Sequence, residues 1–345
     1  MNENGAHNKE LYYRLVAFWV VCEAFAGGIM HATNFPFTGM IVSALAVTSV
    51  ILIAYYIPDR AAILRATLIV AVFKLMLSPQ SPPPAYIAVF FQGLLGYLLF
   101  YHKKYFRLSA IFLAVLALVE SAIQKILVVA LIYGNSFWRA VDQFVQKLAG
   151  GKDKHYSLYI AEGYVLLHAL TGIFVGIYAA KLAKKAHAWA VVYPKLLLPA
   201  NEVIVDEGQP KRKKKKLKSL FIILWLILLI LFVQAYFYPK HAILPVNDVL
   251  RILLRAVLIL LSWWLIIVPL IMHIMKAKLD SYKEKHKLPI QEVMQLLPGT
   301  KHVFNQSRKR SSAEKGFKRV KLFFKILFIN ILSDQQRRED PITYS

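Results

Sequence analysis

The chain has very little cysteine and few acidic residues, and it lacks the common catalytic motifs. Its single cysteine among 345 residues is Cys22, which excludes an internal disulfide and cysteine-based metal clusters. Asp and Glu total 19 against 43 Lys and Arg, so the formal net charge is +24. No Gly-x-x-x-x-Gly-Lys-Ser/Thr loop is present, so the chain does not hydrolyse ATP by that route. His-Glu-x-x-His and Gly-x-Ser-x-Gly motifs are also absent, which argues against an enzyme without excluding one. We predict no cofactor and no bound metal.

Long apolar runs dominate the chain. Apolar residues make up 58% of it, and a run of about 20 such residues spans a bilayer core. We predict an all-α, polytopic membrane protein with about eight spans, at 11–33, 38–57, 61–78, 84–101, 109–134, 156–180, 217–238 and 249–275. No signal-peptidase-like site follows the first run, so we expect it to be retained.

Positive charge alternates between the connecting loops. The loop at 34–37 and the hairpin Ser78–Pro84 have no cation, whereas 102–107 and 181–218 are basic. The positive-inside rule then predicts that both termini of this multi-pass protein lie on the cytoplasmic side of the inner (plasma) membrane. The external loop at 135–155 fits this rule less well, and its periodicity predicts an amphipathic helix on the outer surface, stopped by Gly150 and Gly151.

Composition divides the chain into three parts. Residues 1–188 form a six-helix membrane module, 189–216 a basic cytoplasmic linker, and 217–345 a two-helix module with an amphipathic, basic tail. We expect the tail to lie on the membrane surface or to dock a partner. The basic residues indicate anionic lipid headgroups in preference to nucleic acid, because no folded nucleic-acid reader accompanies them.

Polar residues at membrane depth gather in the outer halves of the first six spans. Such residues are costly in a bilayer and usually have a function. Their placement predicts an outward-facing substrate pocket, closed below by apolar packing. The candidate substrate-binding residues are His31, Asn34, Lys74, Tyr86, Gln92, Glu120, Gln124, Lys125, Glu162 and His168. Lys74 and Lys125 would meet an anionic group of the solute. Glu120 and Glu162 would meet a cationic or hydrogen-bonding group.

The charged candidates also have structural interpretations. Lys74 could snorkel to the outer headgroups. Glu162 could simply neutralise Lys125 or Lys74, because buried charges usually pair. Glu23, near the middle of the first span, has no evident cationic partner at its depth.

The uncharged candidates and their neighbours have such interpretations too. Glu120 and Gln124 share a helix face, so hydrogen bonding between helices would explain them. His31 and His168 are more often core histidines than metal ligands.

Small residues mark two further helix faces. Ala24 and Gly28 lie one turn apart in the first span, which favours contact with another subunit. Gly172 and Gly176 form a second pair in the sixth span, where internal packing is the favoured interpretation.

Six spans with both ends inside, an outward pocket and a small-residue first span resemble the substrate-binding S-components of energy-coupling-factor (ECF) vitamin transporters. The loop His31–Gly39 and the segment Ser78–Gly96 look like the places where such proteins cap and line the pocket. The basic tail is similar in kind to the coupling helices of the family's T-component, and Ser307–Ser311 loosely matches its Ala-Arg-Gly-like motifs. The resemblance implies uptake of a small vitamin- or cofactor-like solute, energised by separate ATPase subunits. The implied partner contacts are Ala24, Gly28, Arg308 and Arg310.

Two alternatives stay open. In the first, the chain is a non-transport membrane scaffold or lipid-handling protein, and the buried polar residues only hold helices together. In the second, it is a membrane enzyme acting on a lipid headgroup, with His31 or His168 and Glu162 as an acid–base pair.

Overall fold

The computed structural model describes residues 3–23, 37–78, 83–149, 156–198 and 287–333, together with single positions between 247 and 273. The predicted seventh and eighth spans and most of the predicted linker therefore lie outside the described residues. The predicted division at residues 188 and 216 stays a prediction.

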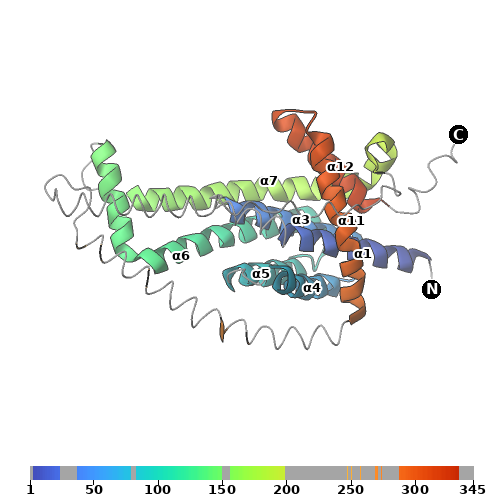
Figure 1. Cartoon of the computed structure of the whole chain (residues 1–345), viewed down its shortest axis with the longest axis horizontal. Coiled ribbons are helices and arrows are strands. Elements are labelled where there is room, and N and C mark those ends of the chain that lie inside the picture. The colour runs from blue at the N-terminus through green and yellow to red at the C-terminus, as the bar shows by residue number, and fades with distance from the viewer. Residues whose placement is uncertain are drawn as a thin grey trace. The chain divides into compact units, whose positions relative to one another are not determined.

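Every regular element in the described part of the chain is helical, which confirms the predicted all-α class (Figure 1). The helices are α1 (Glu3–Val21), α3 (Thr38–Tyr56), α4 (Ala61–Leu77), α5 (Pro83–Leu99), α6 (Phe106–Ala149), α7 (Tyr156–Val192), α11 (Lys287–Ser311) and α12 (Gly316–Leu332). Two short 3-10 helices, η2 (Lys103–Tyr105) and η3 (Pro194–Leu196), precede α6 and follow α7.

Three of these helices are long and apolar enough to cross a membrane, judged by length and composition: Thr38–Tyr56, Phe106–Asn135 and Tyr156–Ala186. A shorter apolar helix covers Pro84–Leu99. These helices are compatible with the predicted membrane class, whereas the count of about eight spans and the sides of the termini stay predictions.

The described residues belong to two compact units. The first contains residues 1–118, 171–208 and 278–345, and the second contains residues 119–170 and 209–277. We describe each unit by itself.

Helix α1 is the centre of the first unit. From Leu15 to Glu23 every residue is buried, because α3, α4, α11 and α12 all pack against this helix. A helix that is apolar all round needs cover on every side. The large side chains of Phe18 and Trp19 are fully buried and fill the space between the helices.

The C-terminal helices supply part of that cover. Phe328 of α12 packs edge-on against Phe18, with ring centres 5.5 Å apart. Arg14 donates a hydrogen bond to the carbonyl oxygen of Ser333. The prediction that the basic tail lies on the membrane surface or docks a partner is thus wrong for the C-terminal half of α12. Its residues Ile326–Leu332 are all buried, because a segment this apolar on all sides needs a helix to cover it, and α1 of the same chain does so.

The start of the predicted linker is also held by α12. Asn330 accepts a hydrogen bond from the Leu198 N–H at 2.8 Å and donates one to the Leu196 carbonyl oxygen at 2.9 Å. Lys325 places its Nζ 3.0 Å from the centre of the Tyr193 ring. Residues 193–198 therefore belong structurally to the first unit.

Glycines let α7 approach α6 closely. A Cβ added to Gly172 would lie 2.7 Å from the Cα of Val115, and one added to Gly176 would lie 2.6 Å from the Cα of Ile111. No side chain fits at those distances, so the two glycines bring the backbones into contact. This confirms the internal-packing interpretation of the pair in the sixth predicted span.

The second unit contains the bend in α6. Gly134 has φ 68° and interrupts the helix, a left-handed conformation that only glycine adopts readily. The helix that follows runs to Ala149, which confirms a helix where one was predicted after residue 135; its position on a membrane surface stays a prediction. Asp142 on that helix accepts a hydrogen bond from the Ser157 N–H at 2.7 Å. Its carboxylate therefore lies at the N-terminus of α7, where negative charge is favourable.

Candidate functional site

Lys74 forms a buried ion pair in the last turn of α4. Its side chain is buried, and its Nζ lies 2.5 Å from Oε2 of Glu23, which is buried as well. The same Nζ donates a hydrogen bond to the Ala85 carbonyl oxygen at 3.1 Å and lies 5.8 Å from the centre of the Tyr86 ring. A charge taken out of water is tolerated when an opposite charge and hydrogen bonds surround it. These contacts thus explain how a lysine fits among apolar helices.

The partner of Lys74 differs from the predicted one. The prediction that Glu23 has no cationic partner is wrong, since Glu23 lies just after α1 and meets Lys74 where α1 packs on α4. The snorkelling interpretation of Lys74 is also wrong, because the side chain is only 4% exposed and turns inward to Glu23.

Gln92 connects α5 to α3. Its Nε2 donates a hydrogen bond to Oγ of Ser43 at 3.3 Å, and both side chains are buried. Its Oε1 is buried without a hydrogen-bond partner among the described residues. One half of this amide is therefore buried without a hydrogen bond among these residues.

Two more buried polar atoms in the first unit share that property. Within the described part of the chain, neither Oη of Tyr86 nor Nε1 of Trp19 has a hydrogen-bond partner. Tyr86 lies beside Lys74, and Trp19 of α1 comes shortly before Glu23, which follows the end of that helix. A buried polar atom without a partner costs about 1–3 kcal/mol. Three such atoms in one unit are unusual, because buried polar groups are nearly always hydrogen-bonded.

Close helix packing positions these side chains. A Cβ on Gly93 would lie 1.9 Å from Oγ1 of Thr67 on α4, and one on Gly96 would lie 2.4 Å from Cγ1 of Val50 on α3. The absence of side chains at both glycines lets α5 press against α3 and α4. The neighbouring Gln92 is consequently held against Ser43.

The structure thus brings Lys74 of the predicted pocket together with Tyr86 and Glu23. Separately, it joins Gln92 to Ser43 and buries the indole of Trp19 in the same unit. We call these residues the Lys74 cluster. Sequence reasoning missed Ser43 and Trp19, since a serine and a tryptophan in an apolar helix are common and carry no signal of their own.

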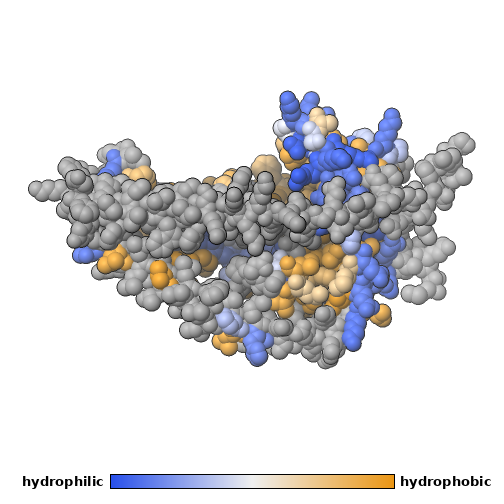
Figure 2. Space-filling view, viewed as in Figure 1, coloured by the Kyte–Doolittle hydropathy of each residue, from blue (hydrophilic) through white to orange (hydrophobic). Residues whose placement is uncertain are grey.

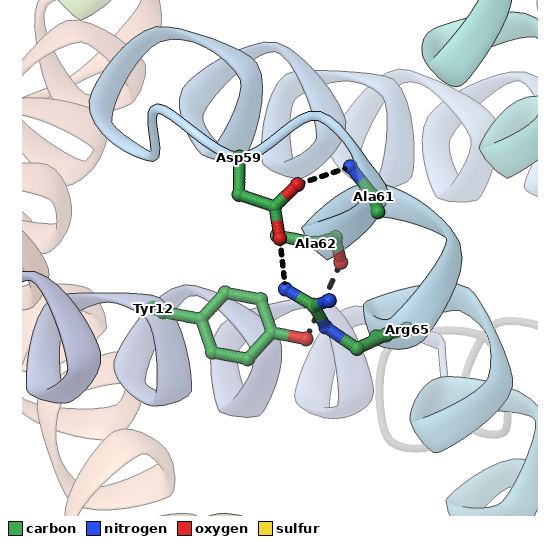
Figure 3. A network of polar contacts seen from close by, with 5 residues as sticks. All are labelled: Tyr12, Asp59, Ala61, Ala62 and Arg65. Atoms are coloured by element: carbon green, nitrogen blue, oxygen red, sulfur yellow. Dashed lines mark hydrogen bonds and ion pairs between the residues drawn. The ribbon is translucent and has the colours of Figure 1, made fainter.

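A second polar network of the first unit lies at the turn between α3 and α4 (Figure 3). Asp59 accepts hydrogen bonds from the Ala61 N–H at 2.9 Å and from the guanidinium of Arg65. Tyr12 of α1 donates to the carbonyl oxygen of Ala62 at 3.3 Å. The Arg65 guanidinium holds the pKa of Asp59 below its usual value. Both charged side chains are 54% exposed, and their contacts hold the turn between α3 and α4.

Other predicted site residues belong to the second unit. Gln124 donates a hydrogen bond to Oε1 of Glu120, one turn away on the same helix. His168 is fully buried, and its Nδ1 is 2.9 Å from the carbonyl oxygen of Tyr164. Oε2 of Glu120 and Nε2 of His168 have no hydrogen-bond partner among the described residues. These contacts lie within one helix each, so they do not join helices.

Lys125 and Glu162 behave differently from the other candidates. Both are exposed, and the ion pairs between described residues include neither of them. Their predicted role as charged walls of the pocket stays a prediction.

The remaining predicted residues are divided between the described and undescribed parts of the chain. Those outside the described residues are His31, Asn34, Ala24 and Gly28. Arg308 is exposed, whereas Arg310 donates a hydrogen bond to the Leu197 carbonyl oxygen at 3.5 Å. Arg310 thus contacts its own chain.

Comparison with protein-family models, with curated proteins and with solved structures gives no match to this chain. The functional argument therefore rests on the geometry of the Lys74 cluster.

Proposed function

We propose that this protein is a membrane transport component that binds a small polar or zwitterionic solute, of vitamin or cofactor size, between its N-terminal helices. The observation that carries the proposal is the Lys74 cluster, where an ion pair and three unpartnered buried polar atoms lie in an otherwise apolar bundle. Separate ATPase subunits would energise uptake, in line with the missing phosphate-binding loop and with the resemblance to ECF S-components.

The chemistry of the cluster favours a solute with both charged and hydrogen-bonding groups. The Tyr86 hydroxyl can donate and accept, the Gln92 carbonyl oxygen accepts, and the Trp19 indole donates. A zwitterion adds no net charge when it binds next to Glu23 and Lys74. Its carboxylate and ammonium each find an opposite charge there, so no unpaired charge stays buried.

Native mass spectrometry of the purified protein tests the proposal, because it detects a bound solute of any identity by its mass. The wild-type protein should carry a co-purifying molecule of vitamin size. The variants Tyr86→Phe and Gln92→Leu remove two of the unpartnered atoms, and each should reduce occupancy about fivefold or more. Ser109→Ala is the matched control, because Ser109 is buried and donates its hydrogen bond to the Leu99 carbonyl oxygen, outside the cluster.

The outcomes separate the two classes of function. Equal occupancy in Tyr86→Phe, Gln92→Leu and wild type would refute the assignment of the site. A protein that never carries a solute but co-purifies with lipid-synthesis enzymes would favour the alternative.

That alternative is a membrane scaffold or lipid-handling protein with a structural polar cluster. One observation favours it: Lys74 is already neutralised by Glu23 and bonded to Ala85. In this case the pair serves to hold α1, α4 and α5 in register.

A further inference from the structure

The turn between α11 and α12 carries a dense group of cations. Residues 308–321 contain one acidic residue, Glu314, and seven basic ones: Arg308, Lys309, Arg310, Lys315, Lys318, Arg319 and Lys321. All seven except Arg310 are exposed, and so is Glu314. We call residues 308–321 the α11–α12 tip.

Two large apolar side chains are exposed among these cations. Phe317 is 82% exposed and Val320 is 48% exposed. They are three residues apart in the first turns of α12, so they share one helix face. Exposed apolar residues next to lysines and arginines are typical of helices that lie in the headgroup region of a bilayer.

The α11–α12 tip has a defined backbone conformation and is held by packing between the two helices. Lys315 is extended, and Gly316 follows with φ 57°, a left-handed conformation that reverses the chain direction into α12. Phe304 of α11 and Phe323 of α12 pack edge-on with ring centres 5.3 Å apart. The far half of α12 is buried against α1, so the cations are presented at a fixed place.

The figures show the tip as a projecting, mostly hydrophilic surface. In Figure 1 the turn between α11 and α12 stands out beyond α1, α3, α4 and α5. Figure 2 shows hydrophilic side chains gathered at the same place, with a few paler and hydrophobic ones among them.

We propose that the α11–α12 tip binds an anionic bilayer surface, with Phe317 and Val320 inserted among the acyl chains and the cations on the lipid phosphates. Each Lys or Arg near such a surface strengthens binding about fivefold. Among the described residues, three helices are long and apolar enough to cross a bilayer, so a lipid surface is within reach. The proposal does not depend on the solute site.

Two other partners fit the observations less well. Nucleic acid would account for the cations but not for the exposed Phe317 and Val320 side by side on one face. An acidic protein surface would need a matching apolar pocket for both side chains. An anionic bilayer supplies both negative charge for the cations and an apolar interior for Phe317 and Val320, without a specific pocket.

A spin label at the tip tests the proposal in the full-length protein. Phe317→Cys can be labelled selectively, because the only other cysteine, Cys22, is buried. The protein is reconstituted into nanodiscs of phosphatidylcholine alone or of phosphatidylcholine with phosphatidylglycerol. We expect collisions of the label with a water-soluble paramagnetic reagent to fall severalfold in the anionic discs, while collisions with oxygen rise. Adding salt to 1 M, where the Debye length is about 3 Å, should reverse both changes.

Charge variants give the matched controls. Reversal of Lys318, Arg319 and Lys321 to Glu should abolish the lipid dependence, whereas Lys318→Arg with Lys321→Arg should preserve it. A label at Ser312→Cys, exposed in the turn before α12, should stay accessible to the water-soluble reagent in both lipids. Equal accessibility of the Phe317 label in neutral and anionic discs would overturn the proposal. So would protection that appears only when RNA or an ATPase subunit is added.

Discussion

Removing one member of the Glu23–Lys74 pair should destabilise the protein far more than removing both. In Lys74→Met the carboxylate of Glu23, only 5% exposed, would be left without its cation. Breaking a buried pair in this way costs about 3–5 kcal/mol. Replacing both members, as in Glu23→Leu with Lys74→Met, is often neutral or stabilising by about 1–4 kcal/mol, because two desolvated charges disappear together.

The hydrogen bond to Ala85 modifies these values slightly. Lys74 donates to the Ala85 carbonyl oxygen at 3.1 Å, and losing a bond of this kind costs about 1 kcal/mol. That loss is common to Lys74→Met and the double variant, so it cancels in a double-mutant cycle. The coupling energy between the two positions should therefore exceed about 2 kcal/mol.

The assay is reversible unfolding of the purified protein in one detergent or lipid mixture, with wild type, both single variants and the double variant compared at the same pH. Single variants within about 0.5 kcal/mol of wild type would refute the reasoning, because surface substitutions have effects of that size. A double variant as unstable as the worse single variant would also contradict it. Such a result would mean that packing, and not charge pairing, sets the cost.

Three further predictions follow from contacts elsewhere. Gly172→Ala should lower the free energy of unfolding by about 1–3 kcal/mol, because its Cβ would overlap the α6 backbone. Gly163→Ala is the control: the space around Gly163 is open, so this variant should be neutral or stabilising by up to about 1 kcal/mol. Thermal unfolding of both variants checks this. Asn330→Ala should leave two backbone groups near residues 196–198 unbonded, and limited proteolysis should then cut there faster than in wild type. The Asp59–Arg65 contact lowers the pKa of Asp59, so its stabilisation is present above the unfolded-state pKa of about 4 and is lost as pH falls through the lower folded pKa. For an exposed pair the effect is at most about 1 kcal/mol, and Asp59→Asn should flatten the stability profile in that acidic range.

Local sequence signals predicted three consecutive helices of the first unit well, whereas α1 begins at Glu3, before the start of the predicted span at 11–33. The predicted spans at 38–57, 61–78 and 84–101 match α3, α4 and α5 within one or two residues. Pro58 and the proline-rich stretch after Ser78 interrupt the apolar runs, and proline ends helices for reasons that need no tertiary contact. Helix α7 runs twelve residues beyond its predicted end at 180, to Val192, because hydropathy marks where a chain becomes polar and not where its helix stops.

Contacts between distant segments could not be predicted in the same way. Glu23 and Lys74 are 51 positions apart, and Arg14 and Ser333 are 319 apart. The predicted first span at 11–33 placed Glu23 near its middle and Lys74 closer to the outer surface, whereas α1 begins at Glu3 and ends at Val21, so that Glu23 follows the end of the helix. Which helices pack together depends on the shapes of many apolar side chains, and an apolar pattern alone does not determine that choice.

The Glu23–Lys74 pair can be used to distinguish a solute-binding protein from a scaffold. A lysine that merely neutralised a glutamate would need no unpartnered polar atoms beside it, since each such atom costs free energy. The Tyr86 hydroxyl beside Lys74 nevertheless has no hydrogen-bond partner among the described residues, and the same holds for Nε1 of Trp19 and Oε1 of Gln92 in the same unit. If the protein is a scaffold, replacing both Glu23 and Lys74 by apolar residues should leave its stability unchanged or raise it. If the protein binds a solute through this pair, the same double variant should stay folded but lose the solute. A stable double variant with normal solute occupancy would exclude the pair from binding, and a stable variant without solute would assign it there.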